Sequence, residues 1–116
     1  MLHFMKLHPG SFQKIKSGTK TVELRLYDEK RQIIKPGDEI EFVNSDVQAQ
    51  TIRVVVKGLY QYDSFEELYQ HFTPIEMGYH PEQMACASPN DMDQYYSREK
   101  QQKYGALAIE IELINA

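Results

Sequence analysis

Hydrophobic and polar residues alternate along several stretches of this chain, most clearly near its C-terminal end. There, Leu107, Ile109, Ile111 and Leu113 are separated by small or acidic residues. Successive side chains of a β-strand point to opposite faces, so this alternation predicts a half-buried strand. By alternation and β-branched content, we expect strands at residues 2–8, 20–27, 39–44, 50–60 and 106–113.

Helical spacing of apolar residues is confined to short segments. Ser64 with Glu67 three residues later is the pattern of a capping box, which begins a helix. Ser88 before Pro89 supplies a second helix start, since proline is favoured at the first helical position. Gly105 is placed to end that helix. We therefore predict three helices, over residues 11–16, 64–72 and 88–104.

Glycine and proline mark the connections between these elements. Gly18 is expected to end the first helix, because glycine adopts the left-handed C-cap conformation at low cost. Pro36 and Gly37 occupy the central positions of a type II turn. Gly58 is where the long fourth strand is expected to bend. The remaining connections are predicted to be a mixed-charge loop at residues 28–32 and an irregular loop at 73–88.

These elements predict the fold class. No strand–helix–strand unit has the continuous apolar strands that are typical of a parallel sheet. We therefore predict an α+β fold, a small and mostly antiparallel β-barrel of about five strands with short helices packed on its rim. The 116 residues are enough for one domain, so residues 1–116 are expected to form a single unit.

Composition excludes several classes of protein. Hydrophobic residues make up 41% of the chain, which is enough for a core and argues against disorder. No apolar run approaches the roughly 20 residues of a membrane helix, and the N-terminus lacks the features of a secretory signal. A single cysteine, Cys86, allows no internal disulfide. We expect a cytoplasmic protein that does not associate with membranes.

Charge is distributed unevenly along the chain. Residues 1–35 contain eight Lys or Arg and three Asp or Glu, whereas the remainder contains five and fourteen, respectively. A net charge of −4 makes the chain a poor non-specific binder of nucleic acid. A basic surface on an acidic body nevertheless suits a specific anionic partner of nucleotide size. The alternative is that each of these lysines is an ordinary solvated residue.

The second predicted strand has one apolar and one charged face. Val22, Leu24 and Leu26 share a face, whereas Glu23 and Arg25 lie on the other, about 7 Å apart along the strand. If this charged face lines a cleft, the arginine fork is suited to hold a phosphate. If the face is exposed, the two residues form an ordinary surface ion pair of little energetic value.

These residues also resemble a known family. The run Gly18-x-Lys20-x-x-Glu23-x-Arg25, followed by Lys35-Pro36-Gly37-Asp38, is similar to the signature of ASCH domains, and the order of elements agrees along nearly the whole chain. The resemblance implies a PUA-like β-barrel with a cleft that binds RNA or a nucleotide. The candidate ligand-binding residues are Lys20, Glu23, Arg25, Tyr27, His8, Tyr95 and Tyr96.

The same sequence features indicate which partners and cofactors to expect. We expect RNA, a nucleotide or a nucleoside as the partner, with tyrosines available to stack on unpaired bases. The four histidines lack the spacing of metal ligands, so neither a metal nor a cofactor is predicted. An acidic surface for a protein partner is a further possibility, although no residue pattern selects that partner. The loop at 73–88, which contains Gly78, is a candidate lid over the cleft.

The resemblance also implies an alternative, because one branch of the family consists of small amidohydrolases that deacylate N4-acetylcytidine. The lysine used by that branch corresponds to Lys20. The position of its threonine is occupied by Glu23, so the nucleophile is missing from its place. If the protein is an enzyme, Lys20 and Glu23 are the candidate catalytic acid–base pair, which requires a shifted pKa for Glu23.

Overall fold

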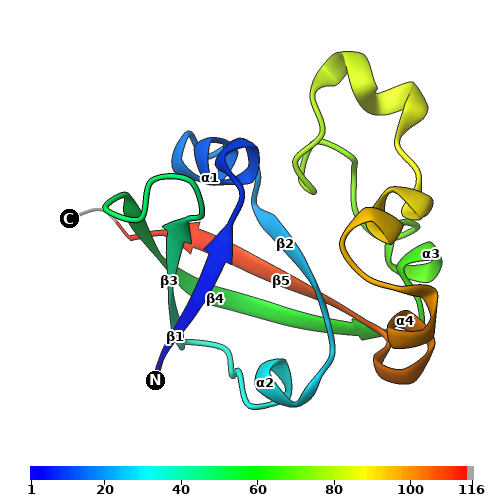
Figure 1. The fold of residues 1–116 in the computed structure, drawn as a ribbon, viewed down its shortest axis with the longest axis horizontal. Helices are drawn as coiled ribbons and strands as arrows, with labels where there is room; N and C mark the ends of the chain where they lie inside the picture. Colours follow the sequence, from blue (N-terminus) through cyan, green and yellow to red (C-terminus); the bar gives the residue numbers. More distant parts are fainter. Residues whose placement is uncertain (115–116) are drawn as a thin grey trace.

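The computed structural model describes residues 1–114, which form five β-strands, as the alternation predicted. Figure 1 shows the strands gathered in one sheet, with the segment that follows α3 projecting beside β2. The predicted bounds agree with the observed ones to within a few residues. The strands are β1 Leu2–Leu7, β2 Val22–Leu26, β3 Glu39–Asn44, β4 Thr51–Tyr62 and β5 Ala106–Leu113.

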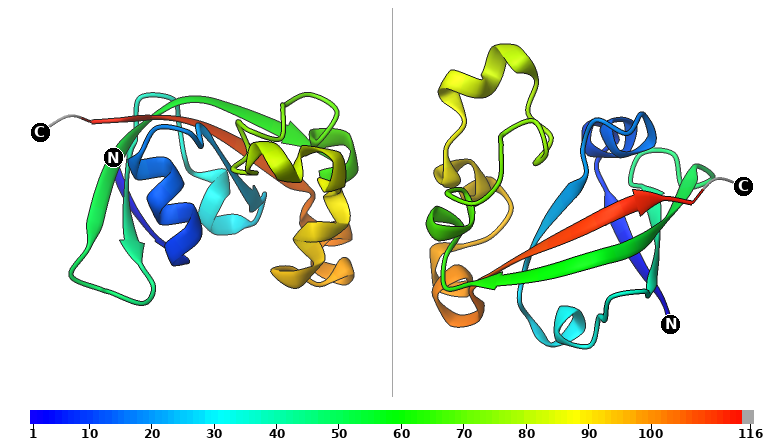
Figure 2. Two further views of the ribbon diagram at one scale, coloured as in Figure 1. Left: turned by 90° about the horizontal axis from the view of Figure 1, so that it is seen from above. Right: turned by 180° about the vertical axis from the view of Figure 1, so that it is seen from behind.

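The strands form one curled, mixed sheet that resembles half of a barrel, as Figures 1 and 2 show. Their order is β1-β3-β4-β5-β2, in which β1 and β3 are parallel and every other pair is antiparallel. The predicted mostly antiparallel barrel-like fold is therefore confirmed. The register between β4 and β5 shifts between Val56 and Gly58, where the sequence predicted a bend.

The helices differ more from the prediction than the strands do. Residues 28–32 were expected to be a loop, but Asp28 accepts a hydrogen bond from the Arg31 backbone N–H and begins a short helix. The helix that begins after Ser64 ends at Leu68 instead of reaching Phe72. The helices are α1 Pro9–Lys16, α2 Glu29–Gln32, α3 Phe65–Leu68, η1 Pro81–Cys86, η2 Pro89–Gln94 and α4 Arg98–Tyr104.

The predicted helix at residues 88–104 is in fact two helices. Ser88 caps the 3₁₀ helix η2, as expected, but this helix ends before Tyr95. Ser97 then accepts a hydrogen bond from the backbone N–H of Lys100 and caps α4, which Gly105 ends at φ 73°. A second N-cap inside the periodic segment therefore divides it. The break places Tyr95 and Tyr96 in the connection between η2 and α4.

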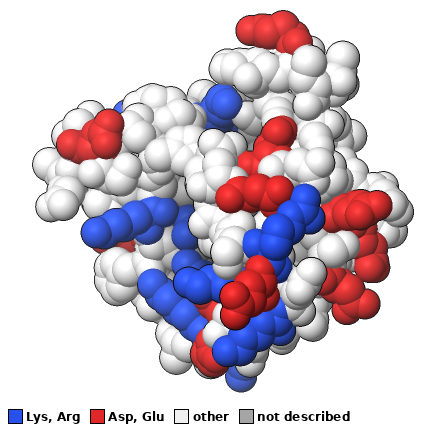
Figure 3. Space-filling view, turned by 45° about the vertical axis from the view of Figure 1, so that its right-hand side comes forward, with Lys and Arg blue, Asp and Glu red and all other residues white. Residues whose placement is uncertain are grey.

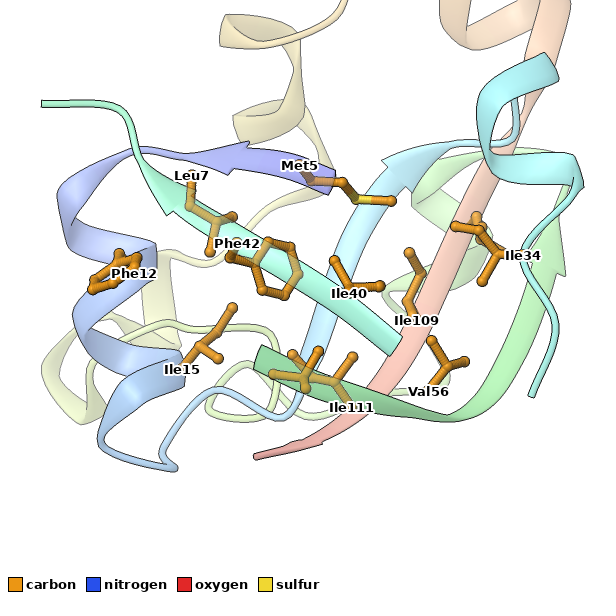
Figure 4. Packing of buried hydrophobic residues seen from close by; sticks show 12 residues of the cluster. Met5, Leu7, Phe12, Ile15, Ile34, Ile40, Phe42, Val56, Ile109 and Ile111 are labelled. Atoms are coloured by element: carbon orange, nitrogen blue, oxygen red, sulfur yellow. The ribbon is translucent and has the colours of Figure 1, made fainter. Parts of the chain in front are cut away.

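The interior of the curled sheet holds the larger hydrophobic core. Side chains from β1, β3, β4 and β5 meet those of Phe12 and Ile15 from α1 there, as Figure 4 shows for the labelled residues. A second core lies against the outer side of β2, where Val22, Leu24 and Leu26 pack with Phe65 and Leu68 of α3. Both faces of β2 are therefore covered, although only one of them is apolar.

Candidate functional site

Three charged side chains form the floor of a cleft beside β2. The Glu23 carboxylate lies 2.8 Å from Lys20 Nζ through Oε1 and 2.7 Å from Arg25 Nη2 through Oε2. The exposed fractions of the Lys20, Glu23 and Arg25 side chains are 8%, 5% and 12%. The charged face of the strand is therefore buried, and its Glu–Arg pair is not the exposed surface pair that we considered as an alternative.

The register of the sheet explains this burial. Glu23 is paired with Ile109, and Arg25 with Leu107, across the antiparallel β2–β5 ladder. Directly opposed residues point to the same face of a sheet, and Ile109 and Leu107 belong to the interior core. The charged face of β2 is thus the inner face of the curled sheet.

Lys20 is positioned by the end of α1. Gly18 adopts φ 84°, as predicted, and its backbone N–H donates to the carbonyl of Ile15. The backbone N–H of Lys20 then donates to the Lys14 carbonyl at 3.1 Å, so the chain turns back over the helix before β2 begins. This turn lets the Lys20 ammonium reach both Glu23 and the Ser11 hydroxyl, 3.3 Å away.

The charges keep Glu23 ionised. Burial alone would raise the pKa of its carboxyl group. The positive charges of Lys20 and Arg25, together with their hydrogen bonds, outweigh burial and lower this pKa to about 2. Glu23 is therefore a carboxylate at neutral pH, with each of its oxygens held by a cation.

The two edge strands of the sheet meet at Arg25. His8 lines the cleft beside β2, although β1, which precedes His8, and β2 lie at opposite edges of the sheet order. The curl brings these edges together, and Arg25 Nη2 donates to the Lys6 carbonyl at 2.9 Å. The Arg25 side chain therefore spans the seam, which is the line along which β1 and β2 come together. His8 is the first residue after β1.

His8, Ser11 and Tyr95 form one wall of the cleft. The His8 and Tyr95 rings are stacked with their centroids 5.8 Å apart. His8 Nε2 lies 3.1 Å from the Ser11 hydroxyl and 3.2 Å from the Tyr95 hydroxyl. Burial and the nearby Lys20 charge lower the pKa of His8, which favours the neutral ring. Tyr96 also lines the cleft and stacks on Phe65.

A second wall of the cleft is formed by Tyr69, Tyr79 and Asp91, whose mutual contacts were not predicted from the sequence. The Tyr79 hydroxyl lies 2.8 Å from the Tyr69 hydroxyl and donates to the Asp91 carboxylate at 2.8 Å. Burial, followed by its hydrogen bonds to Tyr69 and Asp91, raises the pKa of Tyr79, so its hydroxyl stays protonated. Tyr69 directly follows α3, Tyr79 precedes η1 and Asp91 lies in η2, and no local pattern links them.

The cleft between these walls has a volume of about 680 Å³, within the range of small-molecule sites, about 300–1,000 Å³. It brings together six of the seven candidate residues, namely His8, Lys20, Glu23, Arg25, Tyr95 and Tyr96. Tyr27 does not line it, because its side chain packs against the interior core. Among the residues that the structure describes, the charged side chains lining the cleft are Lys6, Lys14, Lys20, Arg25, Glu23 and Asp91.

Gly78 lies directly against the stem of Lys20. It adopts φ 104°, and a Cβ atom there would approach Lys20 Cδ to 2.8 Å. The Glu76 carbonyl accepts hydrogen bonds from the backbone N–H groups of Thr21 and Val22, so this part of the 73–88 segment is joined to the start of β2. The segment therefore forms one side of the cleft.

Replacement of Gly78 by alanine should lower the free energy of unfolding by about 1–3 kcal/mol, through backbone strain and displacement of Lys20. Gly37→Ala is the matched control, because Gly37 has a similar φ of 92° and open space around the added Cβ. Urea unfolding of both variants should show the larger loss for Gly78→Ala. Equal losses of unfolding free energy in the two variants would mean that the contact with Lys20 does not contribute to stability.

The structure offers no metal centre within residues 1–114, where no three His, Cys, Asp or Glu side chains are grouped as ligands. No helix in this described part of the chain is long and apolar enough to cross a bilayer.

On the face shown in Figure 3, basic and acidic side chains are intermingled, so this face has no continuous basic stripe.

Comparisons with known proteins agree with this architecture. The chain is similar to hypothetical protein PH0355, with 37% identity over 98% of this chain and 100% of that one and a TM-score of 0.81. It is also similar to protein PF0455 from Pyrococcus furiosus, with 34% identity over the full length of both chains and a TM-score of 0.73.

More distant similarity and the family model point the same way. A mutant of ZmASCH from Zymomonas mobilis shares the fold with a TM-score of 0.67, at 18% identity over 98% of this chain and 73% of that one. No curated protein matches the chain. The model of the ASCH domain matches residues 5–115. The chain therefore belongs to the ASCH domain family, a PUA-like family that is often associated with RNA binding.

Proposed function

We propose that this protein binds RNA and that one unpaired nucleotide of the RNA enters the cleft above Lys20, Glu23 and Arg25. The observation that carries the proposal is the buried group of two cations around a single carboxylate. Such a group retains one uncompensated positive charge, which is costly away from water. A phosphate group of the ligand would supply the missing negative charge.

The donors left over in this group are suited to phosphate. Arg25 uses Nε and Nη2 for Glu23 and Lys6, and among the described residues no hydrogen bond occupies its Nη1. Lys20 has three N–H donors, two of which are directed to Glu23 and Ser11. We assign phosphate contact to Arg25 and Lys20, and to Glu23 the role of the counter-ion that holds both cations in place.

The aromatic wall is suited to a base. Tyr95 is about half exposed and already stacks with His8, so it offers a rigid ring beside the phosphate-binding floor. Stacking of a base on an aromatic side chain contributes about 1–3 kcal/mol and tolerates different bases. The Tyr69–Tyr79–Asp91 network on the other wall could supply polar contacts to a base edge.

The hydrolase alternative is less well supported by the geometry. A general base must take up a proton near neutral pH, whereas the pKa of Glu23 is lowered to about 2 and both of its oxygens face cations. Release of cytidine from N4-acetylcytidine, lost in a Lys20→Ala variant, would nevertheless favour hydrolysis over binding alone.

Titration with nucleoside monophosphates and with the corresponding nucleosides tests the proposed function. We expect the monophosphates to bind more tightly, and Arg25→Ala to weaken their binding by about tenfold to a hundredfold through loss of a charged hydrogen bond. Arg53→Ala is the control, since Arg53 pairs with Glu39 and Glu41 outside the cleft. Circular dichroism should show both variants folded, because Arg25→Ala leaves a neutral Lys20–Glu23 pair. Binding that is unaffected by Arg25→Ala would contradict the proposal.

A further inference from the structure

A second groove lies on the other side of the seam between β1 and β2. Its volume is about 710 Å³, and it is separated from the cleft by the hydrogen bond between Arg25 and the Lys6 carbonyl. Arg25 and Lys6 line both hollows, so the groove and the cleft adjoin at these two residues. The remaining residues that line it are Phe4, Met5, Lys30, Arg31, Val43, Asn44, Ser45 and Gln48.

The charged residues that line this groove are all basic. Two of the four, Arg25 and Arg31, are paired with Glu23 and Asp28, respectively. Lys6 and Lys30 take part in no ion pair within residues 1–114. On a molecule with a net charge of −4, such a hollow is a local site for an anion.

The two hollows also differ in what they offer a ligand. The cleft has Tyr95, Tyr96 and His8 along its side, whereas the groove has the exposed Ser45 hydroxyl and Gln48 amide beside the Phe4 ring. Aromatic rings stack on bases, while amides, hydroxyls and basic side chains are the usual donors to phosphate and sugar oxygens. The arrangement is that of a base site followed by a backbone site.

Arg31 provides a further observation. Its Nη1 donates to Asp28 at 3.0 Å, but its Nε is buried and has no hydrogen-bond partner within the described residues. An unpaired buried donor is unfavourable, and it calls for an explanation in a native structure. Arg31 lines the groove, so a ligand there could satisfy this donor only after rotation of the Arg31 side chain.

From these observations we propose that the groove holds the phosphate backbone next to the nucleotide in the cleft. The ligand is then a single-stranded polynucleotide, threaded past Arg25, and not a free nucleotide. Arg25 would contact the phosphate between the two sites, with Lys6 and Lys30 on the following phosphates. This inference rests on the proposed function, because it assigns the ligand class of that site.

The test compares three probes on the same protein: the nucleoside monophosphates, the nucleoside triphosphates and the homo-trinucleotides of RNA. We expect the trinucleotides to bind about tenfold more tightly than the monophosphates. Their affinity should also depend more steeply on salt, by about 0.7 in the logarithmic slope for each added phosphate contact. Lys30→Gln, which changes a lysine that lines the groove and not the cleft, should remove this gain and leave monophosphate binding unchanged.

Lys30 is exposed, so Lys30→Gln should fold normally. Lys57→Gln, which changes a lysine on β4 outside both hollows, is the matched control and should retain the gain. Equal binding of monophosphate and trinucleotide would overturn the inference and leave the proposed function intact. A Lys30-dependent gain seen with triphosphates but not with trinucleotides would also overturn it, in favour of a nucleotide polyphosphate. Failure of all three probes would instead reject the proposed function, and the inference with it.

Discussion

Replacement of Glu23 by glutamine is expected to lower the free energy of unfolding by about 3–5 kcal/mol, the usual cost of removing one partner from a buried ionic group. The substitution keeps the size of the side chain but leaves Lys20 and Arg25 as two buried cations with no carboxylate between them. Their mutual repulsion adds to the cost of desolvating each of them. Urea unfolding followed by circular dichroism measures the effect.

The matched control is Glu112→Gln. Glu112 pairs with Lys57 at 3.3 Å, but the exposed fractions of the two side chains are 64% and 53%. A pair this exposed contributes about 0–1 kcal/mol. Adding Lys20→Met to Glu23→Gln should recover part of the lost stability, because one of the two unmatched charges is then removed. A loss for Glu23→Gln as small as that of the control would show that the three charges are hydrated in solution.

Acidification should remove the stabilisation that Glu23 provides, within a defined pH range. The pKa of Glu23 is lowered from its ordinary value of 4.5 to about 2 in the folded protein. A lowered carboxyl pKa stabilises the fold fully above pH 4.5, and this contribution is lost as the pH falls through the folded-state value of about 2. The difference corresponds to about 3 kcal/mol of stability between the two limits.

Unfolding of the wild type between pH 5 and pH 2 measures this dependence. The Glu23→Gln, Lys20→Met double variant is the comparison, because it lacks the titrating carboxylate and retains one cation. Asp38, whose pKa is also lowered to about 2 by hydrogen bonds from His3 and the Lys35 backbone, contributes with the same sign to both proteins. Parallel pH profiles for the two proteins would show that Glu23 does not contribute the expected pH-dependent stability.

Placing a charged group inside the sheet links stability to binding in this fold. The group costs desolvation energy in the free protein, and an anionic ligand would offset part of that cost. Ligand binding should therefore stabilise the protein against unfolding as well as fill the cleft. The same reasoning makes Arg25 central, since it spans the seam and lines both hollows.

The elements that were predicted well depend on neighbouring residues. Alternation located the five strands, and glycine conformations at Gly18, Gly37 and Gly105 were anticipated because positive φ favours glycine. Helix lengths were predicted less well. Ser97 resembles an ordinary helix residue in a periodic pattern, yet it acts as an N-cap and divides the expected helix. Asp28 likewise begins α2 where a charged loop was expected.

The residues that form the floor of the candidate site could also be named from the sequence. Lys20, Glu23 and Arg25 belong to one short segment, so strand periodicity alone relates Glu23 to Arg25. His8, Tyr95 and Tyr96 of one wall were also among the candidates, but the contacts of Tyr69, Tyr79 and Asp91 were not predicted, because these residues meet only through tertiary packing. Tyr27 was predicted to bind the ligand, but it packs against the interior core and does not line the cleft.

Local sequence was thus sufficient for the strands and the glycine turns, because each depends on side-chain periodicity or on a backbone conformation within a few residues. The choice of Lys20, Glu23 and Arg25 as site residues also drew on the resemblance to ASCH domains. The fate of the charged face depends on long-range packing. Pairing of Glu23 with Ile109 turns that face inward, and the curl of the sheet brings Lys6 of the far edge against Arg25. Neither relation has a local signature, since each joins residues that are far apart along the chain and is set by the order of the strands.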